Sequence, residues 1–161
     1  MKLRIEPLGS YEQTVQKIWS FADNYWPDLI PWADYTLGSF FRHVHSLPYH
    51  ADPDGVEFVT RPGLTVEPGY AGYRDCDDKA VLLLGWARAR YVQTGEKNFP
   101  RIVVAGKEED RPHHVYVEFL HGGRWLPAEG TYPEKGGLGV RLWPEKFRRV
   151  FGYGEKNEFF G

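Results

Sequence analysis

The sequence predicts an α+β fold in which the helices come first and an antiparallel sheet follows. Apolar side chains recur mainly at helical spacing up to Gly95, and the dominant period then changes to two, as in strands. Aromatic residues make up 16% of the chain, and glycine and proline occur 18 and 12 times. This composition favours an aromatic core connected by many turns over a bundle of helices.

Three helices are expected in the first part of the chain. The first, over 10–26, begins at a capping box and ends before Pro27. A shorter helix is expected over 34–46. The longest runs from 76 to 94, with Gly95 directly after its end. Because its apolar residues cover most of its circumference, this helix is expected to be central and buried on several sides.

The strand candidates are short and lie between turn signals. One is expected over 57–60, followed by a loop over 61–75. The second part of the chain holds the alternating segments 101–105, 114–120, 124–128 and 139–143. A short closing helix is expected over 145–151, behind Pro144.

Length, charge and cysteine count exclude several classes of protein. The 161 residues suit one domain over 1–161, because no repeat, linker or low-complexity tract divides them. A single cysteine excludes an intrachain disulfide and a four-thiolate zinc site. The net charge of −2 gives no electrostatic reason to expect nucleic acid. No apolar segment is long enough for a signal peptide or a membrane span, so we expect a cytoplasmic protein without a membrane partner.

Cys76 is the candidate nucleophile. It follows a glycine-rich loop over 69–75 and begins the most hydrophobic helix. Free backbone N–H groups and the helix dipole stabilise a thiolate at that position, and the same groups suit an oxyanion. The acids Asp75, Asp77 and Asp78 oppose the thiolate unless they cap the helix and point away from the sulfur. The thiol also needs a base, since an ordinary thiol is mostly protonated at neutral pH.

A predicted hairpin supplies the candidate base, His114, and a carboxylate, Glu129. If Gly122-Gly123 forms a two-residue turn, His121 pairs with Arg124 and the register of the hairpin is fixed. His114 and Glu129 then become diagonal neighbours on one face, within reach of a hydrogen bond. A three-residue turn would instead move Glu129 to the opposite face.

Three other side chains of this hairpin leave alternatives open. His113 is the rival base, although a strand would direct it to the other face. Glu118 shares the face of His114 and is interpreted as a polar neighbour of the site rather than a catalytic group. Tyr116 is expected to pack against Glu129 or to donate a hydrogen bond to it.

Two parts of the sequence carry a family resemblance. The stretch RDCDDKAVLL over 74–83 resembles the nucleophile segment of the transglutaminase-like superfamily of thiol enzymes. The stretches HVYVE over 114–118 and GRWLPAE over 123–129 resemble the histidine and acid segments of that superfamily. The resemblance extends over about 35–132, and the first 34 and last 30 residues have no counterpart in it.

The resemblance implies a papain-like core, with the nucleophile at the start of a central helix that packs on an antiparallel sheet. It implies a triad in which Cys76 attacks an amide or peptide carbonyl, His114 is base and acid, and Glu129 orients the imidazole. Glu129 stands where the family usually has aspartate, and Arg74 where glycine commonly precedes the Asp-Cys pair. The candidate substrate contacts are Tyr73, Tyr116 and Trp125.

The expected reaction is hydrolysis of a peptide or protein substrate, because nothing in the sequence suggests an amine-acceptor site. The alternatives are a cross-linking transglutaminase and a catalytically silent binding or assembly module. A redox-sensing thiol is weaker, since the chain has no resolving cysteine. No cofactor or metal is implied, because His43, His45 and the histidine pair at 113–114 form no known zinc motif. The substrate and the oligomeric state stay open.

Overall fold

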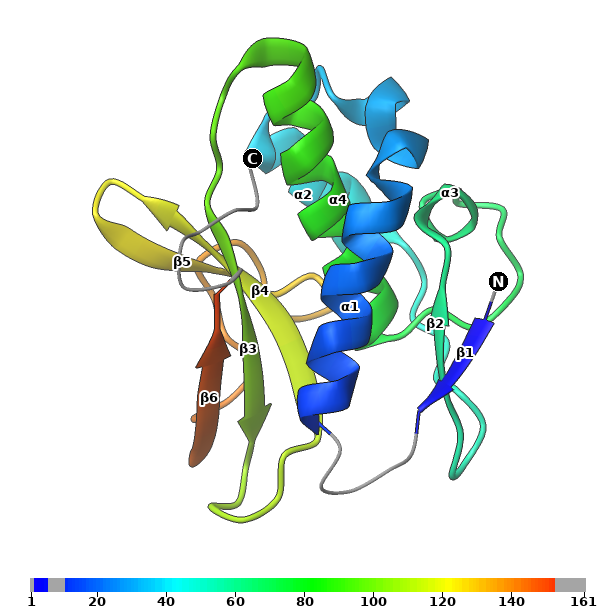
Figure 1. Ribbon diagram of the computed structural model, residues 1–161. Coiled ribbons are helices and arrows are strands. Elements are labelled where there is room, and N and C mark those ends of the chain that lie inside the picture. Colours follow the sequence, from blue (N-terminus) through cyan, green and yellow to red (C-terminus); the bar gives the residue numbers. More distant parts are fainter. Residues whose placement is uncertain (1, 6–10, 153–161) are drawn as a thin grey trace.

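The computed structural model describes residues 2–5 and 11–152 and has helices in the first part of the chain, with the main sheet after them (Figure 1). This order confirms the predicted α+β class. In chain order the elements are β1 (Lys2–Ile5), α1 (Tyr11–Tyr25), the 3₁₀ helix η1 (Trp26–Trp32), α2 (Leu37–Ser46), β2 (Glu57–Thr60), α3 (Pro62–Thr65), α4 (Cys76–Thr94), β3 (Pro100–Gly106), β4 (His114–His121), β5 (Arg124–Ala128) and β6 (Phe147–Phe151).

The main sheet has four antiparallel strands in the order β5-β4-β3-β6. A second sheet pairs β1 with β2, and α1 and α4 stand between the two sheets in the view of Figure 1. Gly122 and Gly123 both have positive φ, at 57° and 77°, which is the geometry of a two-residue hairpin turn. His121 pairs with Arg124 across this turn, so the predicted register is confirmed.

Helix α4 lies at the centre of the molecule, as predicted. It packs against α1, η1, α2 and β4, and its residues 77–87 are all buried. The helix ends at Thr94, and Gly95 follows with a φ of 78°, the left-handed conformation that glycine adopts without strain. Within the ranges 2–5 and 11–152, no helix combines the length and the apolar character that crossing a membrane requires.

The first two helices have different ends from those predicted. Helix α1 ends at Tyr25, and the chain continues as η1 rather than stopping at Pro27. Ser10 of the expected capping box lies outside the described residues. Helix α2 begins at Leu37, three residues later than expected, because the Thr36 side chain accepts a backbone N–H of the first turn and caps the helix there.

The last part of the described chain departs most from the sequence prediction. Residues 139–143 form no regular strand, and Val140 makes only an isolated bridge. The helix predicted over 145–151 is wrong, because this segment contains β6, which pairs with β3. Phe147 and Phe151 are four residues apart, a spacing that suits one face of a helix and also one face of a strand. Pairing decides between them, since it satisfies the backbone groups along the edge of β3.

Candidate active site

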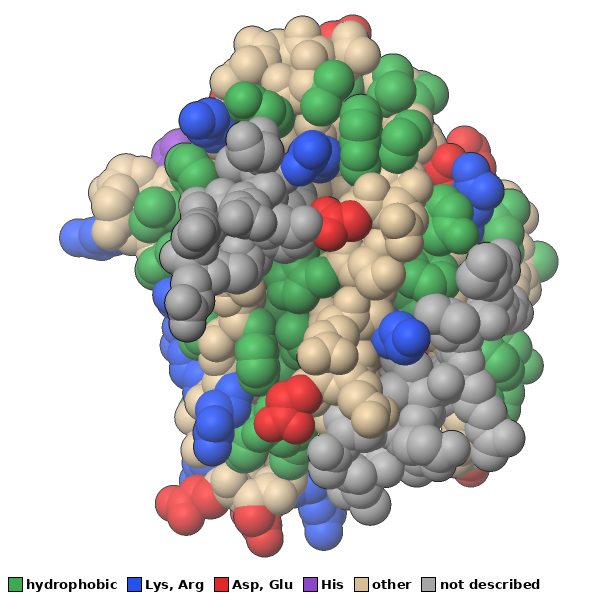
Figure 2. Space-filling view, in the orientation of Figure 1, with side chains coloured by type: hydrophobic (Ala, Val, Ile, Leu, Met, Phe, Trp, Pro, Cys, Tyr) green, Lys and Arg blue, Asp and Glu red, His purple; other side chains and the backbone are tan. Residues whose placement is uncertain are grey.

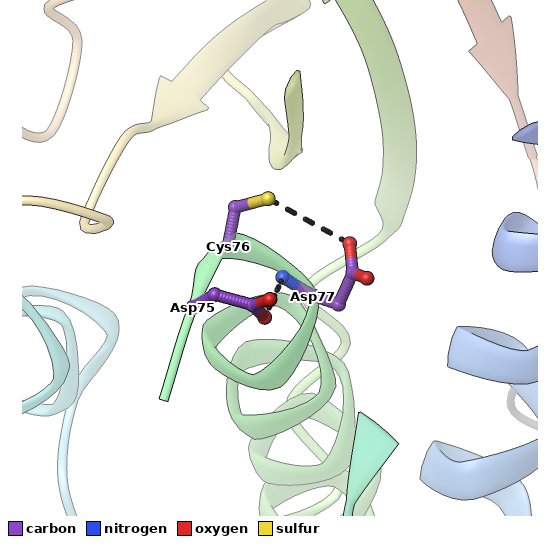
Figure 3. A group of neighbouring side chains, drawn as sticks. All are labelled: Asp75, Cys76 and Asp77. Atoms are coloured by element: carbon purple, nitrogen blue, oxygen red, sulfur yellow. Dashed lines mark hydrogen bonds between the residues drawn. The ribbon is translucent and has the colours of Figure 1, made fainter. Parts of the chain in front are cut away.

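Cys76 is the first residue of α4, and acidic side chains cap the helix around it. Asp75 Oδ1 accepts the backbone N–H groups of Asp77 and Asp78 at 3.1 and 3.4 Å. Asp78 returns the contact through Oδ2 to the Asp75 N–H at 3.1 Å, which completes a capping box. Asp77 differs, because its Oδ1 accepts a hydrogen bond from the Cys76 thiol at 3.6 Å (Figure 3). Two of the three acids therefore cap the helix, and the third faces the sulfur.

Burial changes the protonation of the capping acids. Burial and then the neighbouring charge of Asp77 raise the pKa of Asp75 well above its ordinary value. Burial also raises the pKa of Asp78 to about 7, although hydrogen bonds from the backbone of Asp75 and Thr60 act in the opposite direction. The start of α4 therefore holds less negative charge near neutral pH than its sequence implies.

One group of side chains in the described residues has the spacing of metal ligands. The ligand atoms of Asp75, Cys76 and Asp77 lie within 4.8 Å of one another. Asp75 Oδ1 is already engaged with two backbone N–H groups, so the arrangement is first of all a helix cap. The ring nitrogens of two histidines that the sequence analysis weighed as zinc ligands bond backbone carbonyl oxygens at 2.8 and 3.0 Å, namely those of His43 and His45.

His114 and Glu129 form a buried hydrogen-bonded pair. His114 is the first residue of β4, Glu129 directly follows β5, and His114 Nε2 lies 2.6 Å from Glu129 Oε2. Their side chains are 6% and 1% exposed, so water competes little for this bond. A carboxylate only accepts hydrogen bonds, and Nε2 is therefore the donor. In the neutral ring the other nitrogen, Nδ1, then carries no proton and is a base.

Two aromatic rings pack against His114. The ring of Tyr116 is stacked at a centroid distance of 5.7 Å, and that of Trp143 lies 5.8 Å away. The Tyr116 hydroxyl donates to Glu145 at 2.7 Å, and not to Glu129 as the sequence analysis had allowed. Glu145 takes this role because the segment before β6 lies across the face of the sheet that carries His114, with Trp143 packed on Tyr116. Tyr116 is buried and supports the His114 ring.

The rival groups on β4 have other partners. His113 is exposed, and its Nε2 accepts the Lys107 backbone N–H at 3.2 Å. Glu118 is fully buried and binds Arg101 and Arg148 at 2.8 and 2.9 Å. Figure 2 shows Lys and Arg side chains along the edge of the molecule where β6 lies. Glu118 is therefore the centre of an ion cluster of the sheet.

One of the proposed substrate contacts, Trp125, lies apart from the His114–Glu129 pair. Trp125 is paired with Leu120 near the turn of the hairpin, while His114 begins β4 at the other end, and Arg101 covers the Trp125 ring at 4.0 Å. Tyr73 lies in the loop before α4, with its ring 5.1 Å from that of His50.

Two tyrosines near the thiol were not predicted from the sequence. The rings of Tyr49 and Tyr132 are 4.6 Å apart. Burial raises the pKa of both phenols, and the nearby Cys76 raises each of them further. Glu129 acts on Tyr132 in the same direction, so Tyr132 lies within electrostatic range of both the thiol and the acid. Both tyrosines lie in loop segments without periodicity, and although the resemblance includes Tyr49, neither was predicted to be near the thiol.

Lys79 is a third residue near the site that was not predicted from the sequence. It lies three residues after Cys76 and is 1% exposed, and its Nζ donates to the carbonyl of Gly130 at 2.7 Å. This bond joins the first turn of α4 to the residue that follows Glu129. A lysine among apolar residues of a helix expected to be buried is a signal that could have identified it.

Comparison with known proteins identifies no relative. No protein-family model matches the chain, and neither a curated protein nor a solved structure is significantly similar to it.

Proposed function

We propose that this protein is a thiol enzyme that transfers acyl groups from amide or peptide bonds, with Cys76 as nucleophile and a papain-like core. The observation that carries the proposal is the buried 2.6 Å bond between His114 and Glu129. A carboxylate that holds Nε2 fixes the ring and stabilises the imidazolium, and it leaves Nδ1 to accept a proton from a thiol. The position of Cys76 at the start of a 19-residue helix supports the same role, because the positive end of the helix dipole stabilises negative charge there.

The proposed reaction has two halves. In the first, His114 Nδ1 accepts the thiol proton, and the sulfur of Cys76 attacks the carbonyl carbon of the substrate. The C–N bond breaks, the imidazolium gives its proton to the leaving amine, and a thioester remains on Cys76. In the second half, water gives a proton to His114 and attacks the thioester. The C–S bond breaks, a carboxylic acid leaves, and the proton returns to the sulfur.

The tyrosine pair gives the acyl group a surface to contact. Tyr49 is 36% exposed, Tyr132 is partly buried, and both lie within electrostatic range of Cys76. Aromatic rings offer a large apolar contact area with a polar hydroxyl at the edge, which suits a peptide substrate. Tyr49 and Tyr132 therefore replace Trp125 as the proposed substrate contacts.

One observation favours a second candidate, a silent peptide-binding module. The Cys76 thiol donates to Asp77, and an acidic partner holds the proton on the sulfur. In the enzyme, the thiol proton passes to His114. In the silent module the proton stays on the sulfur, and the tyrosine pair binds peptide without turnover.

Mass spectrometry of a peptide library with added primary amine tests the proposal, with wild type beside Cys76→Ala. We expect wild type to release carboxylic acid products, and Cys76→Ala to release none. Amine-coupled products would assign a cross-linking transglutaminase instead. Identical product sets from the two proteins would contradict the enzyme and leave the binding module.

A further inference from the structure

Lys79 is a buried cation one turn after the proposed nucleophile. Its side chain is 1% exposed, and lysine is almost never fully buried unless its charge is balanced. It has no role in the reaction proposed above, since its ammonium group is bound to backbone and does not face solvent. Its burial in the first turn of α4 therefore needs a separate explanation.

Hydrogen bonds connect Lys79 to the backbone beside Glu129. Nζ donates to the carbonyls of Leu47 and Gly130, both at 2.7 Å. Leu47 follows α2, and Gly130 lies between Glu129 and Thr131, whose N–H donates to Glu129 Oε1 at 3.4 Å. One ammonium group therefore joins α4, the end of α2 and the segment that presents the carboxylate to His114.

The charge of Lys79 also acts on Glu129. Burial, and then the charge of Arg74, lower the pKa of Lys79 to about 7, while Glu129 and Glu134 act in the opposite direction. The Glu129 side chain is 1% exposed, and a buried carboxylate is stable only with charge or hydrogen-bond compensation. Below about pH 7, Lys79 therefore supplies a positive charge on the side of Glu129 reached through Gly130.

We infer that Lys79 is a positioning residue of the proposed thiol site, which holds the Glu129 segment against His114 and balances the buried carboxylate. The role rests on the proposed function, since it matters for chemistry only if the His114–Glu129 pair acts on Cys76. Lys79 touches neither substrate nor thiol in this role. Its effect on the reaction passes through Glu129 and His114.

Arg74 provides a matched control. It is also 1% exposed, lies beside the same end of α4, and donates only to backbone carbonyls, those of Thr65, Pro48 and Glu67. None of these carbonyls belongs to the Glu129 segment. Arg74→Met and Lys79→Met therefore each remove a buried cation with backbone partners, and only the second removes the link to Gly130.

The experiment measures the His114 ring and the thiol separately in Lys79→Met, Lys79→Gln and Arg74→Met. Proton NMR follows the hydrogen-bonded Nε2–H of His114, and alkylation follows Cys76. We expect Lys79→Met to lose the downfield Nε2–H signal and to slow alkylation by about tenfold to a hundredfold. Arg74→Met should keep the His114 Nε2–H signal and the wild-type rate of Cys76 alkylation, even if the variant is less stable and unfolds at a lower urea concentration.

Two results overturn the inference: a wild-type signal in the Lys79 variants, or an equal loss of the signal in Arg74→Met. If Lys79→Met does not fold, Lys79→Gln decides, because it removes the charge while keeping N–H donors, and it should weaken the same signal. The NMR signal does not require a reactive thiol. An inert Cys76 in wild type would therefore contradict the proposed function, while a lost signal in Lys79→Met would still support the positioning of the His114–Glu129 pair.

Discussion

The first turn of α4 and the rest of the same helix are buried in different ways. Residues 77–79, in the first turn, are two aspartates and a lysine, each at most 2% exposed. Residues 80–87 are apolar or glycine, and they pack into the main hydrophobic core. Apolar burial stabilises a fold, whereas burial of charge costs free energy unless each group is compensated. Most of α4 therefore anchors the fold, whereas its first turn gives up stability to hold charged groups around Cys76.

The charged groups of the first turn are compensated mainly by backbone. Asp78 accepts the N–H groups of Thr60 and Asp75, and Lys79 donates to two carbonyls. Except for Asp75, which directly precedes the helix, these partners lie far along the chain, at Thr60, Leu47 and Gly130. The first turn is therefore sensitive to changes at those positions, and the apolar part of the helix is sensitive to lost volume.

The largest expected effect on stability lies in the apolar part of the helix. Trp86 is fully buried, stacks on Phe40 at 5.6 Å and donates its Nε1–H to the Tyr35 carbonyl at 3.2 Å. Trp86→Ala should lower the free energy of unfolding by about 3–5 kcal/mol, because it leaves a cavity. Cys76→Ala should change it by less than about 1 kcal/mol. Urea denaturation of both variants measures the difference. Equal losses of unfolding free energy would contradict the claim that the apolar part of α4 stabilises the fold more than its first turn does.

A smaller effect, about 3 kcal/mol between pH 5 and 7, is expected from the titration of the first turn, since a single shifted group contributes about 1.4 kcal/mol per pH unit. The raised pKa of Asp78 means that the folded protein keeps a proton between about pH 4 and 7 that the unfolded chain releases, so stability falls as pH rises through this range. The lowered pKa of Lys79 means that the unfolded chain keeps the extra proton between about pH 7 and 10, so stability rises there.

Unfolding free energies should therefore fall as pH rises through the range in which Asp75 and Asp78 titrate, and rise again where Lys79 dominates. Asp78→Asn should reduce the slope on the acidic side, where Asp75 still contributes, and Lys79→Met should reduce the slope on the alkaline side. His113 titrates in the acidic range with the opposite sign, because partial desolvation of its otherwise exposed ring lowers its pKa, and comparison with Asp78→Asn separates the two. If the pH dependence of the unfolding free energy is the same in both variants as in wild type, then the burial of Asp78 and Lys79 does not lower stability as proposed.

The smallest stability effect concerns a glycine packed behind Glu129. Gly136 has a φ of 74°, and a Cβ there would lie 2.8 Å from the Glu129 Cγ. Gly55 has a φ of 73° and open space around its Cβ position, so it is the matched control. Alanine at either position should cost about 1–2 kcal/mol from backbone strain. Only Gly136→Ala should also slow alkylation of Cys76, because it displaces Glu129. Equal alkylation rates in the two variants would show that the position of Glu129 does not affect the reactivity of the thiol.

The sequence predicted the parts of the fold whose ends have strong local signals. The range of α4 followed from its apolar residues and Gly95, and the hairpin register followed from Gly122-Gly123. That register also predicted the bond between His114 and Glu129, because a two-residue turn fixes which side chains share a face. Local chemistry was sufficient for these features.

The remaining features depend on contacts between distant parts of the chain. The spacing of Phe147 and Phe151 suits a helix as well as a strand, and only the unpaired edge of β3 decides between them. Tyr132 lies in a loop, and Lys79 contacts the site through the backbone of the loop residue Gly130. Loop segments have no periodicity from which such contacts could be predicted. The sequence therefore indicated the polar pair of the site but neither the supporting cation nor the tyrosine surface.

The most direct test of the central claim is the rate of Cys76 alkylation in wild type, His114→Ala and His113→Ala. Cys76 is the only cysteine of the chain, so every labelled molecule reports on this thiol. If His114 is the base for Cys76, His114→Ala should slow alkylation at neutral pH by at least about tenfold. His113→Ala should react within about twofold of wild type, since His113 is exposed and bonded to the Lys107 backbone. Equal rates for all three proteins would contradict the claim that the His114–Glu129 pair acts on Cys76.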